Sequence, residues 1–371
     1  MFHRPDIGPA EEDAVLEVLR SGWLTTSART KALEKRFAAY RGCARAVGTN
    51  SCTAALHLSL LSLGVGPGDE VITSPITFAS TANVIVHCGA TPVFCDVTED
   101  TLNIDPDALS DAITLRTKAI IAVHFAGHPC DMDEIDAIAA RHGVPVIEDA
   151  AHAVEAEYRG RPTGSLGRAA AFSFYATKNI TSGEGGMLTT NDESLADQAD
   201  ILALHGISRD AWKRYGDEGY KHWDIVAPGY KYNMFDIQAA IVDAQMDRID
   251  QFWERRRQVT EYYDAAFSEM PGVAPLCRRD YVKASHHLYV LRVPRRDEFM
   301  SAIQAQGIGV GVHFRPVHLH QYYRQAFGFR PGMFPVAEAA GESVVSLPLY
   351  PSLGDDDVDR VVAAVREILG G

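Results

Sequence analysis

Short apolar runs alternate with amphipathic stretches through the first 190 residues of the chain. The apolar runs predict strands at residues 44–47, 70–73, 92–96, 118–124, 144–148, 169–174 and 187–190. Apolar positions at helical spacing predict helices between them, at residues 53–63, 106–113 and 132–142. Because parallel strands need long crossover connections, this alternation predicts an α/β domain whose mostly parallel sheet is covered by helices on both faces.

The last third of the chain has a different pattern. A long amphipathic stretch predicts one helix over residues 235–258 that leads out of the first domain. A strand at 287–293, a helix at 297–306 and a closing helix at 355–369 are expected after it. We therefore expect a large domain over residues 1–250 and a smaller α+β domain over residues 251–371.

One lysine stands between an apolar run and a glycine-rich turn. Residues 172–186 read FSFYATKNITSGEGG, so Lys178 follows a predicted strand and precedes the glycines. Burial at such a strand end lowers the pKa of a lysine and frees its amine to attack a carbonyl, as the Schiff-base lysine of a pyridoxal phosphate (PLP) enzyme must. The common alternative is a surface lysine with its charge in water. We interpret the glycines as a turn that lets the chain pass close to the lysine and a cofactor.

A second motif, VPVIEDAAHA at residues 144–153, places Asp149 at the carboxyl end of a strand, where open α/β sheets bind ligands. PLP withdraws electrons only while its pyridine nitrogen is protonated, and a buried carboxylate opposite that nitrogen keeps it so. Asp149 suits this role better than Glu148, because neighbouring side chains on a strand point to opposite sides. Asp149 could instead be the N-cap of a helix, and His152 could be a histidine of the core. When Lys178 is considered with them, the cofactor interpretation is favoured.

A third motif, GTNSCTAAL at residues 48–56, leads from a predicted strand into a predicted helix. Free backbone N–H groups and the dipole at a helix N-terminus bind phosphate well. The hydroxyls of Ser51 and Thr53 add donors, and Ser173 is placed to add another from the neighbouring strand. An ordinary N-cap by Asn50 or Ser51 is the alternative, and it is compatible with phosphate binding.

Together these motifs resemble the DegT/StrS family of PLP-dependent sugar-nucleotide aminotransferases over nearly the whole chain. The similar segments are SGWLTT at 21–26, GPGDEVI at 66–72, EDAAHA at 148–153, FSFYATKNI at 172–180 and GEGG at 183–186. Three more segments resemble the subgroup that contains the UDP-4-amino-4-deoxy-L-arabinose aminotransferase: RDAWKRY at 209–215, GYKYN at 229–233 and GVHFRP at 311–316. The resemblance implies the PLP-dependent transferase fold of type I.

The resemblance also implies roles for single residues. Lys178 matches the Schiff-base lysine, Asp149 the partner of the pyridinium nitrogen, and His152 a neighbour of the ring edge. Phe78 matches the aromatic residue that stacks on the PLP ring. The positions expected near the substrate are Thr26, Tyr175, Glu184 and His313.

The implied phosphate contacts, beside Ser51, are Cys52, Thr53 and Ser173. Cys52 stands where glycine is commoner, so its N–H serves only if the turn tolerates a side chain. Lys231 and Asn233 stand where the broad family has Asn and Arg, an exchange that the close subgroup shares. One of these two, with Asn233 slightly favoured, is expected to reach the phosphate across a dimer interface.

The implied function is an aminotransferase that moves an amino group from L-glutamate to a nucleotide-linked keto sugar, at sugar C4. We expect a homodimer with active sites at its interface, ping-pong kinetics, and a place in cell-surface polysaccharide, lipopolysaccharide or secondary-metabolite amino-sugar biosynthesis. One alternative is a PLP-dependent sugar dehydratase of the same family, in which histidine replaces the lysine; Lys178 argues against it. The other is a non-catalytic regulatory protein that binds PLP or sugar nucleotides.

Composition and charge narrow the function further. A length of 371 residues suits two domains, and a net charge of −14 argues against generic nucleic-acid binding and for a soluble cytoplasmic protein. One segment contains a cationic cluster: Arg209, Lys213, Arg214, Lys221 and Lys231. The cluster indicates either a binding surface for an anionic sugar nucleotide or an ordinary solvated loop. The six cysteines form no CxxC pair, as expected of reduced thiols. Neither a signal peptide nor an apolar run long enough to span a membrane is recognised.

Three histidines near the C-terminal part raise the question of a metal site. His318 and His320 fall on one face of an expected strand, close in sequence to His313. No HExxH pattern or nearby carboxylate accompanies them, so structural or substrate-facing roles are favoured and no metal is expected.

Overall fold

A computed structural model describes residues 1–208 and 224–370 of the chain. In this part, seven strands form one sheet in the order β1 (Arg45–Thr49), β9 (Gly186–Thr190), β8 (Ala169–Ser173), β5 (Val146–Asp149), β4 (Thr117–Val123), β2 (Glu70–Thr73) and β3 (Thr91–Phe94). β9 runs antiparallel to β1 and β8, and the other neighbouring strands are parallel. The prediction of a mostly parallel α/β sheet is therefore confirmed.

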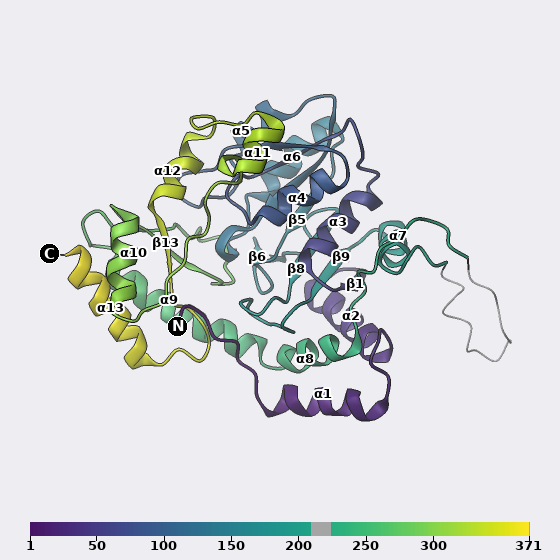
Figure 1. The fold of residues 1–371 in the computed structure, drawn as a ribbon, viewed down its shortest axis with the longest axis horizontal. Coiled ribbons are helices and arrows are strands. Elements are labelled where there is room, and N and C mark those ends of the chain that lie inside the picture. The colour runs from purple at the N-terminus through teal and green to yellow at the C-terminus, as the bar shows by residue number, and fades with distance from the viewer. Residues whose placement is uncertain (209–223, 371) are drawn as a thin grey trace.

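Helices cover both faces of this sheet (Figure 1). Val71 and Ile121 pack in one buried cluster with α3 (Cys52–Ser62), α4 (Ala79–His87) and α7 (Glu193–Ala203). Their neighbours Ile72 and Ile120 pack on the opposite face with α5 (Pro106–Ala112) and α6 (Met132–His142). α2 (Ala28–Arg41) and α8 (Asp236–Met246) share a further cluster with β8 and β9. The alternation of side chains along the strands thus produces the two layers of helices.

The C-terminal part has its own sheet and core. β10 (Ala274–Pro275), β12 (Tyr289–Arg292) and β13 (Val344–Leu347) form an antiparallel sheet. One buried cluster joins this sheet to α9 (Ile249–Phe267), α10 (Arg296–Ala305) and α13 (Asp355–Leu369). α11 (Gln321–Phe327) and α12 (Pro335–Ser343) pack nearer the large sheet, as do the short strands β6 (Glu157–Tyr158), β7 (Arg161–Pro162) and β11 (Val282–Lys283).

The prediction of one helix over residues 235–258 is wrong, because the chain leaves helical geometry between α8 and α9. Arg248 has φ −115° and ψ 4° at this break. Its guanidinium pairs with Asp6 at 3.0 Å and with Glu11 at 2.6 Å. These partners lie far away in sequence, so helical periodicity could not reveal them. The predicted domain boundary after residue 250 falls in the first turn of α9 and stays a prediction.

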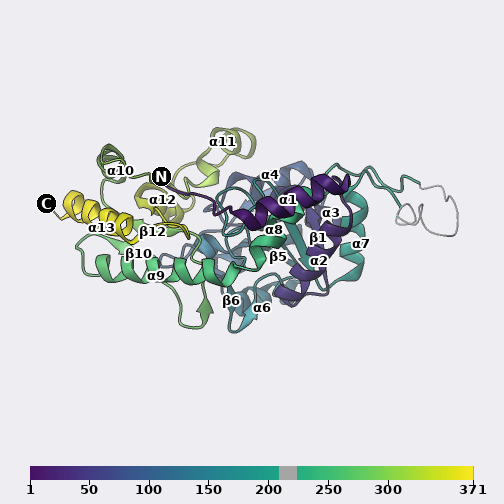
Figure 2. The ribbon, with the colours of Figure 1, turned by 90° about the horizontal axis from the view of Figure 1, so that it is seen from below.

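The N-terminal segment connects the two parts of the molecule. The chain starts beside the C-terminal part, and residues 1–8 lead to α1 (Pro9–Ser21), which lies across α8 (Figures 1 and 2). Within residues 1–208 and 224–370, no helix is long and apolar enough to cross a membrane.

Candidate active site

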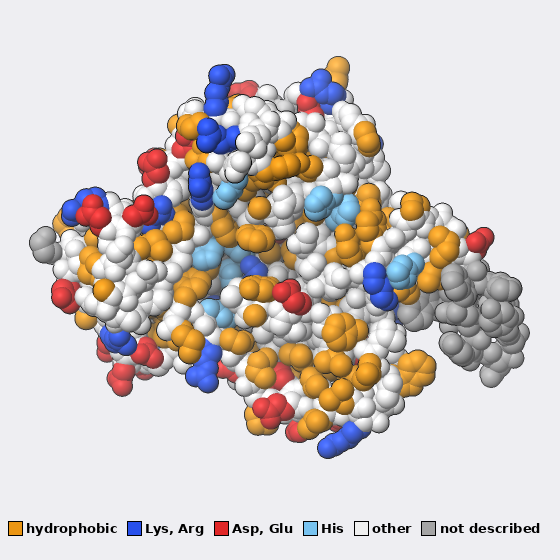
Figure 3. Space-filling model, in the orientation of Figure 1, with side chains coloured by type: hydrophobic (Ala, Val, Ile, Leu, Met, Phe, Trp, Pro, Cys, Tyr) orange, Lys and Arg blue, Asp and Glu red, His pale blue; other side chains and the backbone are white. Residues whose placement is uncertain are grey.

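A cavity of about 770 Å³ opens where β4, β5 and β8 end and α3 begins. Histidine side chains and a basic side chain gather in a hollow on this face of the molecule (Figure 3). The sequence-predicted residues that line the cavity are Ser51, Cys52, Thr53, Phe78, Asp149, His152, Ser173, Tyr175, Lys178, Glu184 and His313. The structure therefore brings most of the predicted site together.

Lys178 lies in the turn that follows β8, with its amine facing the cavity. Its backbone N–H donates to the carbonyl of Tyr175 at 2.9 Å, which closes the turn. Burial lowers the pKa of Lys178 to about 8, and the nearby carboxylate of Asp149 opposes this only in part. The unprotonated amine that attack on a carbonyl requires is therefore within reach near neutral pH.

The two adjacent carboxylates of β5 have different surroundings. Glu148 is fully buried and pairs with Nε2 of His124 at 3.0 Å. It also accepts the backbone N–H groups of three residues at 2.8 to 2.9 Å: Gly164, Leu166 and Gly167. Its hydrogen-bonding capacity is taken up inside the protein, so Glu148 is a structural carboxylate.

Asp149 faces the cavity instead, as strand geometry predicts. Its Oδ2 accepts from the hydroxyl of Thr81 at 2.7 Å, and its Oδ1 accepts from the N–H of Ala151 at 3.2 Å. Burial raises the pKa of Asp149, while these two hydrogen bonds and the charge of Lys178 lower it. A carboxylate so placed stabilises a cationic N–H group in the cavity.

The turn before α3 has the features of an anion site. Ser51 caps the helix, accepting the N–H of Ala54 at 3.1 Å, so the N-cap alternative is correct and leaves other donors free. Within residues 1–208 and 224–370, the backbone N–H groups of Cys52 and Thr53 have no partner. Gly186 lets β9 pass this turn, because a Cβ there would lie 2.5 Å from the nitrogen of Cys52.

Sequence reasoning missed His287, which lines the cavity beside His152 with their ring centroids 4.3 Å apart. Asn179, next to Lys178, donates both amide hydrogens, to Glu155 at 2.8 Å and to the carbonyl of Ser285 at 2.9 Å. Its oxygen therefore accepts from Nδ1 of His287 at 2.9 Å, which leaves Nε2 of that ring with its lone pair. Burial lowers the pKa of both histidines, so neither adds positive charge beside Lys178. The pair His286-His287 at the start of a predicted strand was the available signal.

His313 lines the cavity from a segment whose Gly311 forms a bridge with Ser346 of β13. Its Nδ1 is hydrogen-bonded to the hydroxyl of Ser346 at 2.8 Å, and burial lowers its pKa to about 4. His318 is buried against Glu338, with Nε2 3.0 Å from the carboxylate. Residues 317–319 form a 3₁₀ turn, so the predicted strand face carrying His318 and His320 is wrong. In the part of the chain that the structure describes, no group of three or more His, Cys, Asp or Glu side chains could hold a metal ion.

Three predicted residues do not line the cavity and lie together beside the turn before α3. Asn233 pairs with Thr49 in an isolated bridge and donates through Nδ2 to the hydroxyl of Thr26 at 2.6 Å. The carbonyl of Lys231 accepts from Nδ2 of Asn50 at 3.1 Å. The remaining members of the predicted cationic cluster, Arg209, Lys213, Arg214 and Lys221, lie outside the described residues, as does the segment at 209–215.

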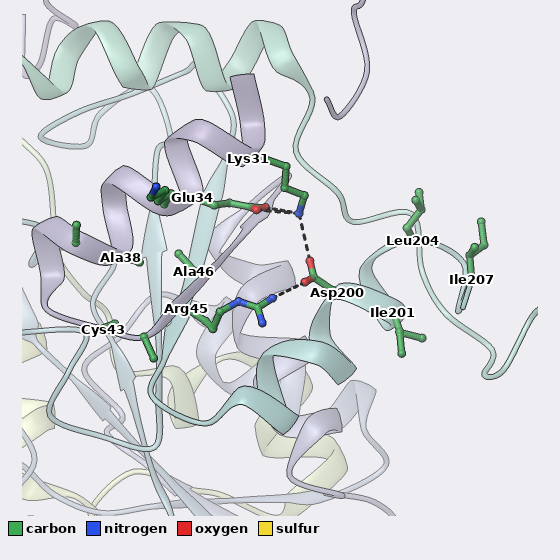
Figure 4. Close-up of a pocket in the computed structure, with 13 residues that line it drawn as sticks. Lys31, Glu34, Ala38, Cys43, Arg45, Ala46, Asp200, Ile201, Leu204 and Ile207 are labelled. Carbon is green, nitrogen blue, oxygen red and sulfur yellow. Dashed lines mark hydrogen bonds and ion pairs between the residues drawn. The ribbon is translucent and has the colours of Figure 1, made fainter. Parts of the chain in front are cut away.

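A second cavity, of about 790 Å³, lies between α2, β1 and α7 and contains none of the predicted site residues (Figure 4). Lys31 pairs there with Glu34 at 2.8 Å and with Asp200 at 3.5 Å, and Arg45 pairs with Asp200 at 3.0 Å. Glu34 also accepts the N–H of Gly48 at 2.9 Å. We interpret this network as a structural link between α2, β1 and α7.

Comparisons with known proteins point to one enzyme family along nearly the whole chain. The profile of the DegT/DnrJ/EryC1/StrS aminotransferase family matches residues 5–366. The spore coat polysaccharide biosynthesis protein SpsC of Bacillus subtilis (strain 168) is 51% identical over 377 residues, covering 100% of this chain and 97% of SpsC.

Solved structures share the fold over the whole chain at lower sequence identity. The sugar aminotransferase Spr1654 of Streptococcus pneumoniae in its PMP form has a TM-score of 0.95 at 36% identity, covering 100% of this chain and 99% of that one. Its PLP form has a TM-score of 0.94 at 36% identity, covering 100% and 98%. Helicobacter pylori PseC, an aminotransferase involved in the biosynthesis of pseudoaminic acid, has a TM-score of 0.93 at 29% identity, covering 100% and 99%.

Proposed function

Because the chain belongs to the DegT/DnrJ/EryC1/StrS aminotransferase family, we propose that it transfers an amino group from L-glutamate to C4 of a nucleotide-linked keto sugar. The chain is an aminotransferase with the PLP-dependent fold, and its cofactor is PLP. The names of its relatives support a sugar acceptor and a role in polysaccharide or amino-sugar biosynthesis. The observation that carries the proposal is one cavity that holds the amine of Lys178, the carboxylate of Asp149 and free N–H groups of α3.

The residues present fit PLP. Lys178 would hold its aldehyde carbon, Asp149 its pyridine nitrogen, and the backbone of Cys52 and Thr53 its phosphate. The close approach of Gly186 to this turn requires a residue without a Cβ, so β9 can lie directly against the proposed phosphate site. When bound, the cofactor supplies an electron sink that stabilises negative charge at the carbon of the reacting amine.

The chain's own residues supply proton transfer and charge control. In our proposal Nζ of Lys178 takes the proton from the α-carbon of L-glutamate and, in the second half-reaction, delivers a proton to sugar C4. Asp149 would keep a proton on the ring nitrogen of the bound cofactor. His152 and His287 are neutral, so they do not oppose protonation of Lys178 during the transfer.

We also propose that the protein works as a homodimer with active sites at the interface. Thr26, Lys231 and Asn233 lie outside the cavity of their own chain, as expected if they serve the cavity of a partner. Hydrophobic side chains gather over the N-terminal helix region on the face that carries the cavity (Figure 3). Leu19 in α1 is 48% exposed and Trp23, just after α1, is 62% exposed, and a partner chain would cover such apolar side chains. Mixing Lys178→Ala and Asn233→Ala chains should restore activity that neither has alone.

A cytoplasmic location completes the proposal. All six cysteines are free thiols in the structure. Free thiols suit a reducing compartment, where disulfides are rare. Thiol titration of protein purified under nitrogen should therefore detect all of them in the denatured chain.

A panel of UDP-, dTDP- and GDP-linked 4-keto sugars tests the function. We expect 2-oxoglutarate to form from L-glutamate in proportion to an amino sugar on one of these acceptors. A single turnover with L-glutamate alone separates an enzyme from a regulatory protein, because only an enzyme releases 2-oxoglutarate. Loss of a sugar hydroxyl without gain of nitrogen would support the dehydratase instead and overturn the proposal.

A further inference from the structure

The N-terminal segment contributes two side chains to the active-site cavity, Phe2 and His3. The segment is fixed at both ends. Asp6 pairs with Arg248 at 3.0 Å, at the break between α8 and α9. At the other end the backbone of Phe2 passes so close to Gly309 that a Cβ at 309 would lie 2.6 Å from the nitrogen of Phe2. These contacts hold Phe2 and His3 in place as part of the cavity wall.

Phe2 packs on a histidine that already faces the cavity. Its ring is stacked on that of His313, with centroids 5.5 Å apart and an angle of 22° between the planes. The hydroxyl of Ser346 is hydrogen-bonded to Nδ1 of His313 at 2.8 Å. The histidine is thereby fixed between a hydroxyl and an aromatic ring, and the ring of Phe2 adds apolar surface suited to the C–H groups of a sugar.

His3 brings a polar atom without a partner. Its Nε2 is buried and makes no hydrogen bond within residues 1–208 and 224–370. Burial lowers the pKa of His3 to about 3, so the ring is neutral and offers either a lone pair or an N–H. A buried polar atom left unpaired is unfavourable, and a hydroxyl of a bound molecule would satisfy it once the ring turns Nε2 toward the cavity that His3 lines.

We propose that Phe2 and His3 form the recognition wall for the sugar ring of the acceptor, with Phe2 contacting its C–H face and His3 one of its hydroxyls. This inference rests on the proposed function. Residues that fit PLP, such as Asp149 and Cys52, belong to the large sheet and α3, whereas this wall lies with residues 309–313 of the C-terminal part. The wall therefore acts on the acceptor and leaves the reaction with L-glutamate unchanged.

The two half-reactions of the PLP-loaded enzyme test the inference separately. The first is followed by the change in cofactor absorbance on adding L-glutamate, and the second by the KM for the UDP-, dTDP- or GDP-linked 4-keto sugar that the unaltered enzyme converts. Phe2→Ala and His3→Ala should each raise that KM about tenfold and leave the first half-reaction within about twofold. Phe2→Leu and His3→Gln, which keep apolar bulk or a hydrogen-bonding nitrogen, should recover part of the loss.

Arg4→Ala is the matched control, because Arg4 is exposed on the same segment and does not line the cavity. An unchanged KM in both alanine variants would overturn the inference while the proposed function stands. Equal slowing of both half-reactions would also overturn it, since the segment would then act on the whole site. If the unaltered enzyme converts none of the keto sugars, the proposed function fails and this inference fails with it.

Discussion

The two sides of the active-site cavity are assembled in different ways. The side formed by the large sheet uses short contiguous motifs, with Asp149 ending β5 and Lys178 following β8. The other side gathers residues from four separate segments, at 2–3, 287–288, 311–314 and 347–349. Parallel strands bring their carboxyl ends to one edge by topology alone. The second side depends on tertiary contacts such as the stacking of Phe2 on His313.

The two sides of the cavity therefore have different proposed roles, one in cofactor binding and the other in acceptor binding. Residues of the sheet side fit the cofactor, which takes part in both half-reactions, so their variants should damage both. The opposite side holds the residues that we assign to the acceptor, so their variants should damage only one.

Lys178→Ala should have the largest effect. Without the amine there is neither an attachment point for the cofactor nor a group to move the proton, so both half-reactions should fall by roughly 10³-fold or more. The absorbance of lysine-bound cofactor should disappear, while circular dichroism should show an intact fold. Activity retained in either half-reaction would contradict the role of Lys178.

Amide substitutions of the adjacent carboxylates Asp149 and Glu148 should affect different properties, the reaction rate in one case and the folding stability in the other. Asp149→Asn removes the charge facing the ring nitrogen and should slow both half-reactions about 100-fold with a small change in stability. Glu148→Gln removes a buried charge that accepts three backbone N–H groups and should lower the free energy of unfolding by roughly 2–4 kcal/mol. Kinetics and urea unfolding measure the two effects. The opposite pattern would reverse the assignments of Asp149 and Glu148.

The buried amine should also destabilise the cofactor-free protein in a pH-dependent way. Lys178 has a pKa of about 8 in the folded chain, against 10.5 for a free lysine. Below about pH 8 both states are protonated and the burial penalty is fully present. Between pH 8 and 10.5 the unfolded chain binds the additional proton, so the free energy of unfolding contributed by Lys178 rises with pH.

Lys178→Met should therefore stabilise the cofactor-free protein at pH 7, by on the order of 3 kcal/mol, and the gain should shrink toward pH 10. Urea unfolding of both proteins across this range measures the difference. A gain that is independent of pH would show that packing, and not the charge, is responsible.

Asn179→Ala should have an intermediate effect, because Asn179 joins the two sides. Its amide ties the turn of Lys178 to Glu155 and fixes the protonated nitrogen of His287. We expect about a tenfold loss in both half-reactions from a less well positioned Lys178. In ¹⁵N-histidine spectra of the cofactor-free protein, His287 should lose its preference for a proton on Nδ1. An unchanged tautomer would contradict this positioning role.

The same contrast explains what the sequence could predict. The strands of the large sheet, three of its helices and the motifs around Ser51, Asp149 and Lys178 follow from local patterns, because strand order needs only topology to bring them together. The cavity residues Phe78, Tyr175 and Glu184 were expected only from the family resemblance. The break at Arg248 could not be predicted, since it is accompanied by ion pairs with Asp6 and Glu11 more than 200 residues away. Phe2 and His3 were missed for the same reason: nothing local shows that the start of the chain reaches Gly309.

Ser346→Ala should have the smallest effect, and it should affect only the half-reaction with the keto sugar. Its hydroxyl holds Nδ1 of His313 at 2.8 Å, while the ring remains stacked on Phe2. One of two constraints on the histidine is then lost, so we expect only a two- to threefold rise, roughly, in the KM for the keto sugar and no change with L-glutamate. Combined with Phe2→Ala, which removes the other constraint, the loss should exceed the product of the single effects, because both act on His313. Simple multiplication of the two effects would mean that Phe2 meets the sugar without acting through His313.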